Sequence, residues 1–77
     1  MSAAYVAVKI DPKATKDVTR DIAHGRHVKQ VSVIAGRYDL LVYMQAETQD
    51  NLFHAVINEI RMIPGVASTE TWVVCPS

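Results

Sequence analysis

Residues 28–45 read VKQVSVIAGRYDLLVYMQ and predict a β-hairpin. The first run, residues 28–34, places valines among polar side chains, and the second run, residues 38–45, is rich in residues that favour strands. Between them, residues 35–37 (Ala-Gly-Arg) include a glycine, which adopts turn conformations without steric cost. We therefore expect two antiparallel strands in the middle of the chain.

The residues before the hairpin predict a strand and then a helix. In residues 4–10 (AYVAVKI) the apolar even-numbered positions share one face. Asp11 and Pro12 are typical of a helix start, because a carboxylate can cap free amides and proline lacks the amide that would stay unpaired there. Gly25 can end this helix, which we expect over residues 12–24. Its apolar stripe at four-residue spacing consists of Ala14, Val18 and Ile22.

A second helix and a last strand follow the hairpin. Thr48 or Asp50 can cap the helix, and Pro64-Gly65 stops it. Residues 66–75 (VASTETWVVC) are rich in strand-forming residues. The order βαββαβ predicts an α+β protein of one domain over residues 1–77, with the ferredoxin-like arrangement of a four-stranded antiparallel sheet carrying two helices on one face. The wide apolar face of the second helix comprises Leu52, Phe53, Val56, Ile57, Ile60 and Ile63.

Both faces of the predicted sheet are apolar. Two helices cover only one face, so the strands of a monomer should alternate apolar and polar residues. Residues 40–44 (LLVYM) and 72–74 (WVV) are instead continuously apolar, and Tyr5 and Ala7 lie on the face away from the helices. A second copy of the sheet is the simplest cover, because a two-fold interface is self-complementary. We expect at least a homodimer that forms through the sheet; alternatively, the helices wrap farther and these side chains are exposed singly.

Composition excludes several classes of partner. The chain of 77 residues has eight Lys and Arg residues, spread along its length, and eight Asp and Glu residues, so no basic face for direct binding of nucleic acid is expected. No apolar stretch is long enough to cross a membrane and no leader precedes the first strand, which predicts a cytoplasmic protein without membrane contact. The single Cys75 excludes a disulfide framework and a cysteine-based zinc site, and we expect a small residue at a strand end.

The pattern of titratable residues predicts no catalytic residue, metal site or cofactor. His24 and His27 flank the exit of the first helix, His54 lies on the polar side of the second, and no histidine pair has metal-binding spacing on one helix. His24 suits the negative end of its helix. The glycines are too far apart to form a phosphate loop. Solvated surface charges are expected at Asp17, Asp21 and Glu59.

Two polar clusters remain as candidates for binding a small ligand. In residues 36–39 (Gly-Arg-Tyr-Asp), Gly36 permits close backbone approach, Tyr38 offers a hydroxyl and Asp39 can accept hydrogen bonds from an ammonium group. In residues 68–71 (Ser-Thr-Glu-Thr), hydroxyls and amides can hold a carboxylate. The structural alternative is a glycine turn with local hydrogen bonds and ordinary strand residues. Clusters that meet across a subunit interface would provide both sides of an amino-acid site.

The sequence resembles the effector-binding domain of the Lrp/AsnC family of transcription regulators, also called the RAM domain. The likeness covers nearly the whole chain, from AYVAVK through VKQVSVIAGRYDLLVYM to IPGVASTETWVV, and the combination of GRYD with PGVASTET is its most specific part. The resemblance implies a domain that dimerises through its sheets and associates further into octamers or related rings. It also implies amino-acid binding between dimers.

The resemblance implies effector-binding residues in both polar clusters, although the family signature leaves the position of Arg37 open. The chain begins at the first strand, whereas full-length members begin with a helix-turn-helix domain, so we expect a stand-alone form or a part of a longer regulator. Mixed assembly with full-length relatives is then a route to regulating transcription. The residues carried over are Gly36, Arg37, Tyr38, Asp39, Thr69, Glu70 and Thr71.

Three functions are compatible with these observations. The leading one is an oligomeric amino-acid sensor that is not an enzyme. The second is a small dimeric ferredoxin-like enzyme of the monooxygenase or isomerase type, because fold alone does not decide function. The third is an assembly domain whose polar clusters only make interface contacts. A perturbed acid or base in an apolar cavity within one dimer would favour the enzyme.

Overall fold

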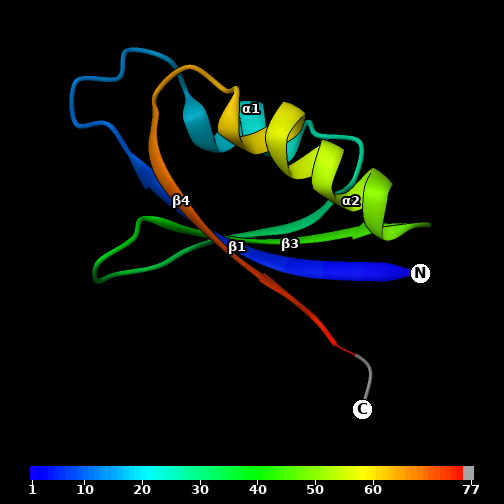
Figure 1. Cartoon of the computed structure of the whole chain (residues 1–77). Coiled ribbons are helices and arrows are strands. Elements are labelled where there is room, and N and C mark those ends of the chain that lie inside the picture. The colour runs from blue at the N-terminus through cyan, green and yellow to red at the C-terminus, as the bar shows by residue number, and fades with distance from the viewer. Residues whose placement is uncertain (76–77) are drawn as a thin grey trace.

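A four-stranded antiparallel sheet carries both helices on one face (Figure 1). The computed structural model describes residues 1–75. The strand order is β2-β3-β1-β4, and the predicted βαββαβ order and ferredoxin-like fold are confirmed. Along the chain the elements are β1 (Ser2–Ile10), α1 (Val18–Ala23), β2 (Val28–Val33), β3 (Leu40–Ala46), α2 (Gln49–Val56), the π-helix η1 (Ile57–Arg61) and β4 (Val66–Val73).

The core lies between the helices and one face of the sheet. Alternate residues of β3 are buried and half-buried along its whole length, which is the two-residue period of a strand. The predicted inward face of β1 is confirmed at Ala4, Val6 and Val8, which are fully buried. The helices contribute Val18, Ile22, Leu52, Ala55, Val56 and Ile60 to the same core.

The first helix begins six residues later than the predicted span of residues 12–24. Asp17 caps α1, because its carboxylate accepts a hydrogen bond from the Arg20 amide at 3.1 Å. The carboxylate of Asp11 accepts from the Lys13 amide at 2.9 Å instead, within a turn. The start at Pro12 was wrong because two aspartates were both suitable caps. The end was predicted correctly, with His24 as the C-cap.

The second helix is capped as predicted but ends in a π-helix. The Thr48 hydroxyl accepts a hydrogen bond from the Asn51 amide at 3.1 Å, so Thr48 rather than Asp50 is the cap. The predicted apolar face is only partly buried, since Phe53 remains 43% exposed and Ile57 42% exposed. After Val56 the chain widens into η1, a conformation that often occurs at functional sites.

The connection between β2 and β3 is longer than predicted, because β3 begins at Leu40 rather than at Tyr38. The Ile34 amide donates to the Asp39 carbonyl at 3.0 Å and closes this connection. Gly36 has a φ of 135° within it, a conformation that L-residues rarely adopt. Residues 36–39 therefore form a loop at the end of the sheet and not the start of a strand.

The face of the sheet away from the helices carries a row of aromatic side chains. Tyr5 pairs with Tyr43 on β3 and with Trp72 on β4, so the three residues lie side by side on this face. The rings of Tyr5 and Tyr43 are 4.9 Å apart, and Trp72 is 49% exposed. In the next row Leu41 pairs with Ala7. We call this surface, made of Tyr5, Ala7, Leu41, Tyr43 and Trp72, the open face.

No helix in residues 1–75 is long and apolar enough to span a bilayer. Cys75 follows β4 and is exposed as a free thiol. Its predicted place next to the end of the last strand is confirmed, although β4 itself ends at Val73.

Candidate functional site

The two predicted polar clusters meet at one pair of side chains. The Tyr38 hydroxyl donates a hydrogen bond to Oε2 of Glu70 at 3.2 Å. Glu70 lies on the open face, because it pairs with Ala7 of β1. Residues 32 positions apart in the sequence are thus joined where the β2–β3 connection passes the last strand. The contact forms within a single chain.

The environment of Tyr38 disfavours ionisation of its phenol. Partial burial raises the pKa of Tyr38, and the hydrogen bond to Glu70 and the negative charge of that carboxylate raise it further. The positive charge of Arg37 acts in the opposite direction. The phenol is therefore a hydrogen-bond donor at neutral pH, and its acceptor is the Glu70 carboxylate.

Gly36 leaves space beside this pair. A Cβ atom built on Gly36 would have no other atom within 4 Å, so the loop is open to a ligand or to another chain. Arg37 is exposed, and its carbonyl accepts a long hydrogen bond of 3.5 Å from Lys9. Arg37 thereby contributes its backbone to the loop and leaves its guanidinium exposed.

Asp39 connects the loop to the central strand. Its Oδ2 atom accepts a hydrogen bond from the Ile10 amide at 2.7 Å, and its own amide donates to the Val8 carbonyl at 2.9 Å. The first contact lies at an irregularity of pairing between Lys9 and Ile10. One carboxylate oxygen of Asp39 is therefore used to position β1, and the predicted ammonium contact would have to use the other.

Thr69 and Thr71 lie on the side of β4 opposite to Glu70. They pair with Val8 and Val6, whose side chains face the helices, because side chains alternate along a strand. Both threonines line a groove of about 820 Å³ between β4 and the second helix, together with Phe53 and Ile57. The structure thus joins Tyr38 to Glu70 and places Thr69 and Thr71 in a separate groove.

The sequence pattern did not predict the contact between His27 and Glu59. Oε2 of Glu59 lies 2.6 Å from Nδ1 of His27, and Oε1 accepts from the His27 amide at 2.8 Å. The expectation of a solvated Glu59 is wrong, since its side chain is 18% exposed and that of His27 is 30% exposed. Glu59 lies within the π-helix η1, which no residue pattern predicted. No group of histidines, cysteines and carboxylates in residues 1–75 could hold a metal ion.

The sequence profile described as the Lrp/AsnC ligand binding domain matches residues 3–76. The chain belongs to this family. An HTH-type transcriptional regulator from Pyrococcus horikoshii is 32% identical over 73 residues, which are 91% of this chain and 49% of that protein. The chain therefore spans about half the length of the curated regulators that it matches.

Homocitrate synthase from Saccharolobus islandicus is 40% identical to this chain over 72 residues. The match covers 92% of this chain and 15% of that enzyme. Most of that enzyme therefore has no counterpart in this chain.

Two solved structures have the same fold over nearly the whole chain. TTHA0845 from Thermus thermophilus has a TM-score of 0.89 and 25% identity, over 100% of this chain and 96% of that one. The transcriptional regulator NMB0573 from Neisseria meningitidis, solved as a complex with L-Met, has a TM-score of 0.79 and 22% identity, over 97% of this chain and 50% of that one. The second likeness supports the fold alone.

Proposed function

We propose that this chain is an amino-acid-binding and oligomerisation module of the Lrp/AsnC type, which acts in the cytoplasm and regulates transcription without binding DNA itself. The observation that carries the proposal is the Tyr38–Glu70 contact at 3.2 Å beside the open Gly36 loop. It joins the loop and the last strand, which are the two segments expected to hold an effector. We place the ammonium group of the amino acid against Glu70 and the free oxygen of Asp39.

The proposed site requires a second dimer for its carboxylate side. Within one chain, Tyr38 and Glu70 offer a hydroxyl and a carboxylate, and neither neutralises an anion. Arg37 is exposed on the same loop and can supply that charge to the site of a neighbouring dimer. In support of this interpretation, NMB0573 was solved with L-Met, so a protein of the same fold takes an amino acid.

Dimerisation is proposed through the open face. Tyr5, Tyr43 and Trp72 form an aromatic row on a surface that the helices do not cover. Burial of such a surface against a second copy is favourable, because apolar area is removed from water and aromatic rings can pack. The dimers would then associate into an octamer-like ring, or with full-length relatives, through the loops at the sheet ends.

The test is thermal unfolding with each common amino acid, followed by Trp72 fluorescence and by light scattering on the same samples. A ligand at about a hundred times its dissociation constant stabilises by about 2.7 kcal/mol and raises the melting temperature by several degrees. We expect a selective shift with one or a few amino acids in a species larger than a dimer. The same shift should be lost in Glu70→Gln and kept in Asp50→Asn, a carboxylate of the first turn of α2.

Two other outcomes would count against the proposal. An oligomer whose melting temperature no amino acid changes would favour an assembly domain in which Tyr38 and Glu70 only make contacts. Turnover by a monomer or dimer in an activity screen would favour the enzyme hypothesis. Membership of a regulator family weighs against that hypothesis, and the match to 15% of homocitrate synthase gives no reason to transfer its activity.

A further inference from the structure

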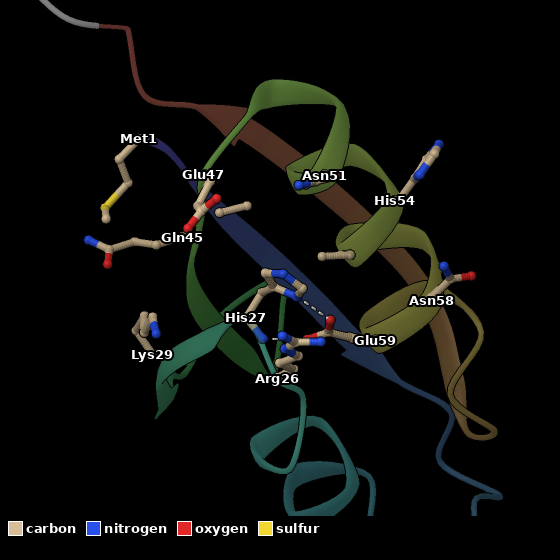
Figure 2. Close-up of a pocket in the computed structure, with 12 residues that line it drawn as sticks. Met1, Arg26, His27, Lys29, Gln45, Glu47, Asn51, His54, Asn58 and Glu59 are labelled. Atoms are coloured by element: carbon tan, nitrogen blue, oxygen red, sulfur yellow. Dashed lines mark hydrogen bonds and ion pairs between the residues drawn. The ribbon is translucent and has the colours of Figure 1, made fainter.

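A second cleft lies away from the open face, between strand ends and the second helix. Its volume is about 570 Å³, within the usual range for small-molecule sites. Figure 2 shows Gln45 and Glu47 on the strand side, residues of α2 and η1 on the other side, and His27 between them. None of the residues carried over from the family, 36–39 and 69–71, lines it.

The centre of the cleft is a fixed imidazole. Glu59 accepts from the His27 amide at 2.8 Å and lies 2.6 Å from its Nδ1 atom, so one carboxylate holds both the backbone and the ring. A proton on Nδ1 donates to Glu59, which leaves Nε2 as the ring nitrogen free to meet a ligand (Figure 2). Gly25 makes this possible, because a Cβ atom there would lie 2.7 Å from Oε1 of Glu59.

The second helix presents a polar stripe to the cleft. Asn51, His54 and Asn58 follow one another at three- and four-residue spacing and all line it. On the neighbouring side of the same helix Phe53 and Ile57 are exposed. Because the stripe has amide groups that can both donate and accept, it can bind hydroxyl, ammonium and carboxylate groups.

Two cationic side chains at the cleft favour an anionic group beside them. The Glu59 carboxylate accepts hydrogen bonds from the amide and the ring of His27, and this contact is an ion pair only when the imidazole is protonated. Arg26 and Lys29 line the cleft and form no salt bridge within residues 1–75, and Glu47 is a further acid of the lining. The guanidinium of Arg26 can bind a carboxylate with two parallel hydrogen bonds. Glu47 repels a second negative charge and accepts from a donor group instead.

We infer that this cleft binds a small carboxylate that also carries a hydrogen-bond donor, the chemistry that hydroxy acids and amino acids share. The carboxylate lies against Arg26 and Lys29, and its donor group faces Glu47 and the polar stripe. His27, fixed by Glu59, forms the floor between the two ends. This site is separate from the one proposed at Tyr38 and does not depend on it.

The experiment is an NMR titration of the isotope-labelled full chain at constant ionic strength. The resonances followed are the imidazole of His27 and the side-chain amides of Asn51 and Asn58. The probes are L-lactate, L-alanine, propionate and lactamide, which have the same carbon skeleton. We expect saturable shifts with lactate, alanine or both, weaker binding of propionate, which lacks the donor, and no shift with lactamide, which lacks the charge.

Matched variants locate the binding. Arg26→Gln should weaken it by about tenfold, the loss expected for one charge-assisted hydrogen bond. Arg20→Gln, a variant of an α1 arginine outside the cleft, should leave it unchanged, and so should Glu70→Gln. The probe that binds more tightly identifies the ligand as a hydroxy acid or an amino acid.

Several results would overturn the inference. An absence of saturable shifts with every probe removes the site. If lactamide binds as tightly as lactate, the cleft has no anion-binding side. If propionate binds as tightly as lactate, the cleft has no side that binds the donor group. If Arg26→Gln and Arg20→Gln lose the same affinity for the probe, the binding depends on the overall charge of the protein and not on this cleft. Because Glu70→Gln is tested alongside, failure here is distinct from failure of the effector site at Tyr38.

Discussion

Single side chains of this domain join segments that are far apart in the sequence. Asp39 positions the Ile10 amide and Glu59 positions His27, and in both cases a carboxylate accepts from a backbone amide on another segment. Hydrogen bonds of an ionised acceptor are stronger than those between neutral groups. Tyr38 and Glu70 form the corresponding contact between two side chains, and its effect on Tyr38 can be measured directly.

Glu70→Gln should lower the pKa of Tyr38. The substitution removes the negative charge and weakens the acceptor, two of the causes that raise this pKa, while partial burial remains. Because the folded pKa lies above the unfolded value of about 10, the stability from this contact is complete below about pH 10 and is lost as pH rises through the folded pKa. Ultraviolet titration of the tyrosines should show one phenol ionising at lower pH in the variant.

The control for that titration is Asp50→Asn, which removes a carboxylate from α2. Its titration curve should superpose on that of the unmodified chain. If Glu70→Gln also superposes, the contact at 3.2 Å does not form in solution. Tyr38→Phe would then identify which part of the curve belongs to Tyr38.

At the level of elements, turns with little free space determine how the helices are placed. Gly65 precedes β4 with a φ of 99°, and its carbonyl accepts from the Asp11 amide at 2.8 Å. A Cβ atom at Gly65 would lie 2.5 Å from Cγ2 of Val18, in the first turn of α1. The turn after η1 therefore packs directly against the first helix.

Gly65→Ala should lower the free energy of unfolding by about 3 kcal/mol, because it combines backbone strain with a clash in the core. Gly36→Ala is the matched variant, since Gly36 also has a positive φ but no neighbour within 4 Å. It should cost about 1–2 kcal/mol from backbone strain alone. Urea unfolding monitored by Trp72 fluorescence measures both values. Equal losses in the two variants would show that the clash with Val18 is relieved.

The elements were more predictable than the contacts between them. Alternation of apolar residues depends on the strand alone, so the inward face of β1 followed from the sequence. The start of α1 did not, because Asp11 and Asp17 have the same capping chemistry and the choice depends on the contact of Asp11 with Gly65. Glu59 contacts His27 from a π-helix that no residue pattern predicted.

The candidate site was predicted in part for the same reason. The motifs indicated the two segments that meet at Tyr38 and Glu70. Side chains alternate along β4, so Thr69 and Thr71 point to the side of the sheet opposite to Glu70. Residues 69–71 were predicted as one cluster, and the sequence pattern did not separate the two sides. Whether the effector touches all seven residues therefore depends on how the subunits assemble.

At the scale of the whole molecule, one face of the sheet is covered by helices and the other carries the aromatic row. Trp72 is 49% exposed at the end of that row and makes no contribution to the single-chain core. A surface of this kind is unusual for a protein that functions as a monomer. Whether a second copy of the chain covers this surface is therefore the most direct test of the proposed dimer.

Trp72→Glu should dissociate the dimer into folded monomers, because one carboxylate on each side of the two-fold axis would be buried against an apolar surface. Light scattering coupled to size-exclusion chromatography measures the mass, and circular dichroism checks the fold. Met62→Glu introduces the same charge at an exposed apolar residue after η1 and should leave the mass unchanged. A dimer that persists in Trp72→Glu would place the interface elsewhere.

The position of β1 in the sheet also governs how the chain can fold during synthesis. This first strand lies in the interior of the sheet, between β3 and β4, and its pairing with β4 joins residues near opposite ends of the chain, such as Ala4 and Val73. One edge of β1 therefore stays unpaired on the ribosome until the last strand emerges. Non-local pairing of this kind slows folding, and the exposed edge is open to association with other nascent chains during that interval.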